Sequence, residues 1–99
     1  MLHILRHSPA SDPRFASCLR VLGGNQNLLL IEDAVYALLP QSQALNNLKI
    51  LPSSVSLYVL QADLLARGMA LDDLPRRIRP IDYEQMVELC GQCHKVVSW

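Results

Sequence analysis

The sequence is poor in charged and in aromatic side chains. Charged residues fill 18% of its 99 positions, where about a quarter is usual, and aromatic residues fill 5%. Nine basic and nine acidic side chains cancel, so no net field draws the chain to the phosphates of nucleic acids. We therefore expect no direct contact with nucleic acid, and we interpret the one dense basic stretch, Arg76 to Arg79, as a solvated loop.

Long hydrophobic runs are also missing. No apolar stretch approaches the ~18 residues of a membrane span, and the first residues lack the apolar core and cleavage site of a signal peptide. We expect a cytoplasmic protein without membrane contact, whose three cysteines are reduced thiols. Hydrophobic residues nevertheless make up 51% of the chain. Because exposed apolar patches usually mark partner sites, the composition favours a subunit of an oligomer, with an unusually apolar monomer as the alternative.

The motifs of the common cofactor and metal sites are absent or misplaced. Gly23-Gly24 follows a predicted helix instead of opening one, so it does not form a phosphate-binding loop, and no G-x-S-x-G hydrolase motif occurs. The string from Cys90 to His94 (CGQCH) has the pattern of haem attachment, a redox pair, or zinc ligands completed by His3 or His7. It lies at the end of a predicted helix, where the dipole opposes a thiolate. We predict no cofactor and no metal, with Cys90 packed inward and Cys93 as an ordinary surface thiol.

Short apolar strands alternate with helical patterns along the chain. The predicted strands are 1–5, 28–31, 55–60, 79–81 and 96–99. The predicted helices run from Asp12-Pro13 to residue 22 and over 34–39, 42–48 and 62–67, and a last helix is capped by Asp82. In that last helix the spacing of Tyr83, Met86, Val87 and Cys90 predicts the buried face. The alternation indicates a single α/β domain over 1–99, with a small open, mostly parallel sheet and helices on both faces.

Ligands and partners of such folds gather at the carboxyl ends of the strands. These predicted ends are Arg6-His7-Ser8, Glu32-Asp33, Gln61-Ala62-Asp63 and Asp82-Tyr83. Cys18 lies elsewhere, on the apolar face of the first helix. It is either a buried small hydrophobe or, with Arg14 and Arg20 nearby, a thiol that accepts sulfur as a persulfide.

Almost the full length of the chain resembles the TusB/DsrH family of small sulfur-relay subunits. The matching stretches, in order, are Met1-Leu2-His3 with Ser8-Pro9, Ser17 to Arg20, Leu28 to Ala37, Leu57 to Leu60, Asp63 to Gly68, Ile81 to Tyr83 with Val87 to Leu89, and Val97 to Trp99.

This resemblance implies a DsrE-like fold and a cytoplasmic complex with TusC-like and TusD-like homologous subunits, arranged as a dimer of heterotrimers. Such a complex passes persulfide sulfur from a TusA-like donor toward a TusE-like carrier, for 2-thiouridine at the wobble position of tRNA. The similar DsrEFH-type complexes serve dissimilatory sulfur oxidation instead, which is the first alternative. An independent thiol or redox protein using Cys18, or Cys90 with Cys93, is the second alternative.

One departure from the family bears on mechanism. The active, TusD-like paralogues carry a cysteine just before a helix that ends in Arg-Gly, whereas the equivalent stretch here, Leu60 to Gly68, has none. We therefore expect a mainly structural subunit in which Cys18 is the one candidate persulfide carrier. Candidate interface residues are Asp33, Tyr36 and Trp99, and their alternative roles are a helix N-cap, a packed aromatic and a hydrophobic plug.

Overall fold

All five strands of the protein run parallel in one sheet. The computed structural model describes residues 1–99 and contains β1 (Leu2–Leu5), β2 (Asn27–Leu30), β3 (Ser56–Leu60), β4 (Ile78–Ile81) and β5 (Val96–Ser98). Their order across the sheet is β4-β3-β2-β1-β5. The predicted α/β class and the parallel sheet are therefore confirmed, and each predicted strand is found within two residues of its expected bounds.

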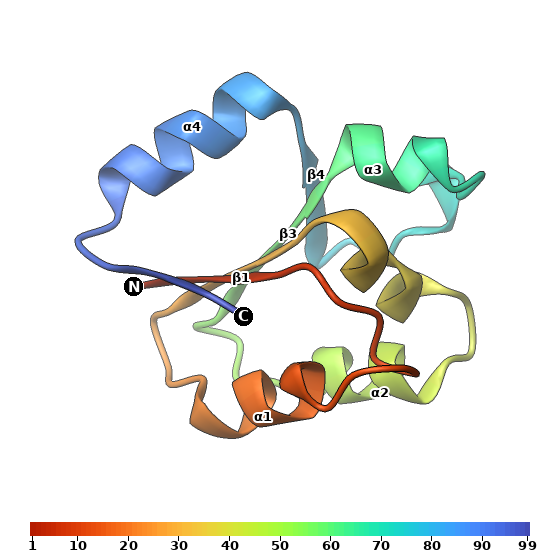
Figure 1. Ribbon diagram of the computed structural model, residues 1–99, viewed down its shortest axis with the longest axis horizontal. Helices are drawn as coiled ribbons and strands as arrows, with labels where there is room; N and C mark the ends of the chain where they lie inside the picture. The colour runs from red at the N-terminus through yellow and green to blue at the C-terminus, as the bar shows by residue number, and fades with distance from the viewer.

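Helices cover both faces of the sheet, but unequally. The first face carries α1 (Arg14–Val21), the 3-10 helix η1 (Glu32–Leu38), α2 (Gln43–Lys49) and α3 (Gln61–Ala66), while α4 (Tyr83–Gln92) covers the second. Figure 1 shows α4 on one side of the sheet and α1 beside α2 on the other. The cause is strand order: β1 to β4 advance in one direction, so right-handed crossovers place their connections on one face, and only the return to β5 uses the other.

The two faces bury different amounts of apolar surface. Sixteen buried residues form one cluster beneath α1, η1, α2 and α3, whereas Leu2, Leu29 and Ile81 form a second cluster beneath α4. None of the helices is long and apolar enough to span a membrane. The first face therefore carries most of the hydrophobic stabilisation, and the second depends on one helix.

The ends of the helices follow from local chemistry. Ser42 Oγ accepts a hydrogen bond from Leu45 N–H at 3.1 Å and caps α2, and Asp82 forms a capping box with Gln85 at the start of α4. Gly68 ends α3 with φ of +75°, directly after the predicted helix over 62–67. Its N–H and that of Met69 bond back to the carbonyls of Leu65 and Leu64, which is the Schellman pattern.

Four local predictions differ from the structure. The expected helix over 34–39 is the 3-10 helix η1, which starts at Glu32. The first helix was expected to start at Asp12-Pro13, but α1 begins at Arg14 with Pro13 as its N-cap. Asp12 Oδ1 still accepts a hydrogen bond from Arg14 N–H at 2.8 Å. In α4 the residues on the sheet are Met86, Leu89, Cys90 and Cys93, whereas Tyr83 and Val87 are 57% and 67% exposed. Both sets satisfy the i, i+3, i+4, i+7 spacing, so periodicity alone does not choose between them.

The fourth correction concerns Arg77, which is not a solvated loop residue. Its guanidinium donates to the backbone carbonyls of Lys49 at 3.1 Å and Leu51 at 2.6 Å, and also to those of Leu48, Pro52 and Val55. These carbonyls belong to the end of α2 and the loop that leads into β3. Arg77 thus fixes this loop and neutralises the negative end of the α2 dipole.

Candidate functional site

Polar side chains from η1 and α3 meet at the carboxyl ends of β2 and β3. Because β2 and β3 are neighbours, Glu32, which follows β2, comes next to Asp63 on α3. Asp63 Oδ2 accepts a hydrogen bond from the Glu32 N–H at 2.7 Å. Glu32 needs this support, because its φ of +50° lies in the left-handed region that non-glycine residues seldom adopt.

Arg67 is the centre of this cluster. Its Nη2 and Nε donate to Asp33 Oδ1 at 3.0 and 3.2 Å, and its Nη1 donates to the carbonyl oxygen of Asp63 at 3.1 Å. The guanidinium also lies 5.9 Å from the ring centroid of Tyr36. The hydrogen bond to Asp33 raises the pKa of Arg67 above its ordinary value, so the group stays charged. Arg67 therefore ties α3 to η1 and orients the exposed Asp33 and Tyr36.

No thiol lies at this edge. Gln61 and Ala62 begin α3, and neither is a nucleophile. Of the three cysteines, Cys18 is on α1, and Cys90 and Cys93 lie at the end of α4 on the other face of the sheet. The cluster can make ionic and hydrogen-bonded contacts, but it has no atom that accepts sulfur covalently.

Cys18 lies in the core, with a relative exposure of 0%. Burial raises the pKa of its thiol from 9.0 to about 12. Arg14 and Arg20, which favoured a persulfide in the sequence, interact with Asp12 and Ser17. A persulfide carrier needs a thiolate and access to solvent, and in this structure Cys18 has neither.

The other two cysteines lie at the carboxyl end of α4 and pack against the sheet. Cys90 faces the sheet as expected, but Cys93 is half-buried in the same cluster and is not the surface thiol that we predicted. His3 is buried, and its two ring nitrogens bond Gln26 Oε1 at 2.8 Å and Trp99 Nε1 at 3.2 Å. No three His, Cys, Asp or Glu side chains gather in a metal-binding arrangement.

The structure brings together two of the three candidate interface residues. Asp33 and Tyr36 share the contact with Arg67, and Tyr36 is 38% exposed. Asp33 is not an N-cap, because Ile31 holds that position in η1. Trp99 lies apart from them. It is partly buried against the larger cluster with its indole stacked on His3, which agrees with its alternative role as a hydrophobic plug.

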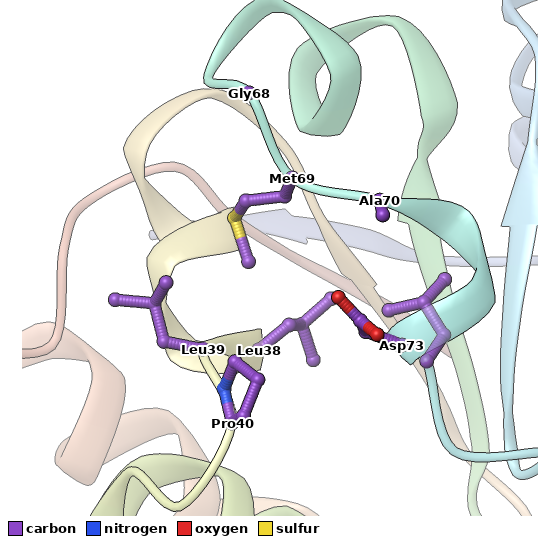
Figure 2. Close-up of a pocket in the computed structure, with 8 residues that line it drawn as sticks. Leu38, Leu39, Pro40, Gly68, Met69, Ala70 and Asp73 are labelled. Carbon is purple, nitrogen blue, oxygen red and sulfur yellow. The ribbon is translucent and has the colours of Figure 1, made fainter.

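Two apolar hollows adjoin the cluster. A groove of about 450 Å³ runs between Tyr36, Leu39, Pro9 and Ala44, and a cavity of about 190 Å³ lies between the end of η1 and the loop after α3. Figure 2 shows the Met69 side chain reaching across this cavity toward Leu38 and Leu39. The cavity is smaller than the ~300 Å³ at which small-molecule sites begin, so it fits an apolar side chain better than a metabolite.

The sequence pointed to the strand ends but missed Arg67 and Asp63 as the residues that join them. The available signal was the polar residues after each strand, Glu32-Asp33 and Gln61 with Asp63, combined with the rule that parallel strands end at one edge. Nothing in the sequence paired Arg67 with a carboxylate 34 residues away.

Some known proteins are similar to this chain in sequence, and others are similar in fold. A family described as DsrH like protein matches residues 7–96. Proteins named TusB from Shigella dysenteriae serotype 1 (strain Sd197) and Escherichia coli O139:H28 (strain E24377A / ETEC) are each 35% identical over 99 residues, which is the full length of both chains.

Among solved structures, the ychN protein of E. coli superposes with a TM-score of 0.76 at 17% identity, covering 99% of this chain and 97% of that one. A protein of unknown function from Methanobacterium thermoautotrophicum gives a TM-score of 0.73 at 16% identity, covering 99% and 96%. These two likenesses concern the fold alone.

Proposed function

The chain belongs to the family of DsrH-like proteins, and from this premise we propose that it is a TusB-like subunit of a sulfur-relay complex. In this proposal the single domain assembles in the cytoplasm with TusC-like and TusD-like subunits as a dimer of heterotrimers. The complex passes persulfide sulfur from a TusA-like donor toward a TusE-like carrier for the 2-thiolation of tRNA wobble uridine. The chain itself holds the partners in place and carries no sulfur.

One observation supports the structural role above all others. The carboxyl edge of β2 and β3 carries a hydrogen-bonded ionic cluster of Glu32, Asp33, Asp63 and Arg67, with no cysteine in it. Sulfur transfer through persulfides needs a reactive thiolate at the site. The relay thiol of the complex must then belong to a partner, and this edge is left to bind proteins.

The surface beside that edge has the mixed character of a protein interface. Tyr36, Leu39 and Leu65 are each at least 38% exposed, next to the half-exposed ion pair of Asp33 and Arg67. Aromatic and arginine side chains are enriched at interface centres, and burial strengthens their bonds. We propose that Tyr36 and Asp33 contact a homologous subunit, and that Trp99 supports the same interface by fixing β5 against β1.

Co-purification tests this proposal. The tagged chain is co-expressed with its TusC-like and TusD-like partners, and the native mass of the purified material is measured. We expect all three subunits to elute together. The double variant Asp33→Asn, Tyr36→Ala is expected to lower recovery of the partners at least tenfold, because ~1–2 kcal/mol is lost at each interface anchor.

The matched control is Tyr83→Ala with Glu88→Gln, which removes an exposed tyrosine and an exposed carboxylate from α4 on the opposite face. Equal recovery of partners by both double variants would contradict the placement of the interface. A chain that runs as a monomer in the presence of both partners would contradict the proposed function itself.

A second pathway is supported by the family that matches residues 7–96, whose description is DsrH-like. In a DsrEFH-type complex the same structural role would serve dissimilatory sulfur oxidation. Measurement of 2-thiouridine in tRNA from a host deleted for this chain separates the two: loss of the modified base supports the tRNA pathway, and unchanged tRNA supports sulfur oxidation.

A further inference from the structure

Cys90 and Cys93 lie together on the sheet-facing side of α4 at its carboxyl end. Both pack with Met86 and Leu89 against the cluster of Leu2, Leu29 and Ile81. Both are half-buried, so a small reagent reaches them, whereas Cys18 is fully buried on the other face. Small reagents therefore have access to Cys90 and Cys93 but not to Cys18.

The backbone of the pair suits a disulfide. Residues three apart on a helix have Cβ atoms ~5–6 Å apart, and a disulfide joins Cβ atoms at ~3.5–4.5 Å, so a small adjustment is needed. Cys93 is placed to make it, because it is the C-cap of α4 with an extended backbone (φ −95°, ψ 133°). Gly91, between the two cysteines, has open space around it.

The negative end of the α4 dipole opposes a thiolate at Cys93, and a hydrogen bond donated to its sulfur offsets this effect, so we take Cys93 Sγ as the attacking atom. Asn27 Nδ2 donates to Cys93 Sγ at 3.6 Å, and such a bond is stronger when the sulfur is a thiolate. The basic residues His94 and Lys95 follow directly in the chain and are exposed. Cys90, one helical turn away, then serves as the resolving thiol.

We propose that Cys90 and Cys93 form a dithiol site that a low-molecular-weight disulfide, such as oxidised glutathione, converts into an intramolecular disulfide. The Cys93 thiolate attacks one glutathione sulfur, the glutathione S–S bond breaks, and one glutathione thiolate leaves. The Cys90 thiolate then attacks Cys93 Sγ and releases the second glutathione. Two electrons pass from the cysteine pair to the small disulfide, and the two thiol protons pass through solvent to the leaving thiolates.

The position of the pair gives the reaction a structural consequence. α4 alone covers the second face of the sheet, and residues 93–95 join it to β5, whose first bond to β1 runs from Leu2 N–H to the Lys95 carbonyl at 2.8 Å. A disulfide therefore ties the end of α4 to the segment that enters β5. The redox state of the pair acts on the packing of this helix, at a distance from the Arg67 cluster.

The experiment treats the full native chain with oxidised glutathione and follows its intact mass. We expect a species lighter by two hydrogens, release of two reduced glutathione molecules per chain, a Cys90–Cys93 link in peptide maps, and reversal by dithiothreitol. Cys18→Ala is expected to react in the same way. Cys90→Ser is expected to stop at a stable glutathione adduct on Cys93, and Cys93→Ser to react at least tenfold more slowly than the wild type.

Several results would overturn the proposal: a wild-type chain that keeps a glutathione adduct, one that stays reduced, one that links Cys18, or one that forms disulfide-bonded dimers. The wild-type measurement is decisive by itself, so loss of folding in a variant does not remove the test. Far-ultraviolet circular dichroism before and after oxidation verifies that the reacting protein is folded.

Discussion

The buried thiol of Cys18 allows a quantitative test of the view that this chain carries no sulfur. Its pKa is raised from 9.0 to about 12, which lowers the thiolate fraction at about pH 8 roughly a thousandfold relative to an unperturbed cysteine. Burial at 0% exposure slows any reagent further. We expect iodoacetamide pulses on the native chain to modify Cys90 and Cys93 first, with Cys18 at least ~1000-fold slower than in urea-unfolded protein.

Mass spectrometry of the digested chain gives the three rates in one experiment. The urea-unfolded sample is the control, because there all three cysteines should react at similar rates. A native Cys18 that reacts within tenfold of its unfolded rate would show instead that α1 opens readily and that the thiol is available to accept sulfur.

The same thiol predicts how stability depends on pH. The folded pKa lies above the unfolded pKa, so unfolding releases a proton between about pH 9 and 12, and stability falls as pH rises through this window. At about pH 11 the loss is ~2–3 kcal/mol, from ~1.36 kcal/mol per unit of pKa difference. Cys18→Ala lacks this ionisation. The free energy of unfolding in urea of the wild type should therefore fall by that amount, relative to the free energy of unfolding of Cys18→Ala, from about pH 8 to pH 11. A constant difference would contradict the assigned cause.

Three further predictions concern residues that fix the scaffold. Arg77→Met leaves the carbonyls at the end of α2 without their charged donor and should lower the free energy of unfolding in urea by ~2–3 kcal/mol. Arg76→Met, at an exposed neighbour, should lower it by less than ~0.5 kcal/mol. Equal effects would contradict the role of Arg77 in fixing this loop. Gly68→Ala should lower the free energy of unfolding by ~1–2 kcal/mol because of the φ of +75° at this position. Gly91→Ala, within α4, should be neutral or stabilising by up to ~1 kcal/mol. The reverse order would contradict the role of Gly68 at the end of α3. Trp99→Leu removes the donor to His3 Nδ1 and part of the large cluster and should lower the melting temperature by ~10 °C or more; an unchanged value would show that this contact contributes nothing.

The order of elements was predictable because it depends on local patterns. Unbroken apolar runs such as Leu28 to Leu30 and helix caps such as Asp82 act within a few residues, and the structure has them where expected. The side of α4 that faces the sheet was not predictable, because two residue sets satisfy the same spacing. Contact with Leu2, Leu29 and Ile81 selects the set that includes Leu89 and Cys93.

The site was predictable in position but not in its bonds. Parallel strands place Glu32-Asp33 and Asp63 at one edge, which the sequence indicates. The pairing of Arg67 with Asp33, and of Arg77 with carbonyls 22–29 residues away, depends on how η1 and the loop after α2 fold back on the sheet. Long-range contacts of this kind leave no periodic signal in the chain.

The most direct test of the account is sulfur transfer by a reconstituted complex whose copy of this chain has no cysteine. In the variant Cys18→Ala, Cys90→Ser, Cys93→Ser, radiolabelled sulfur is supplied through a TusA-like donor and its arrival on a TusE-like carrier is measured. We expect the rate to equal that of the complex with the unaltered chain, because in the proposed function the chain serves only as a scaffold. A complex that still assembles but transfers sulfur at least tenfold more slowly would contradict the account, since a thiol of this chain would then lie on the path of the sulfur.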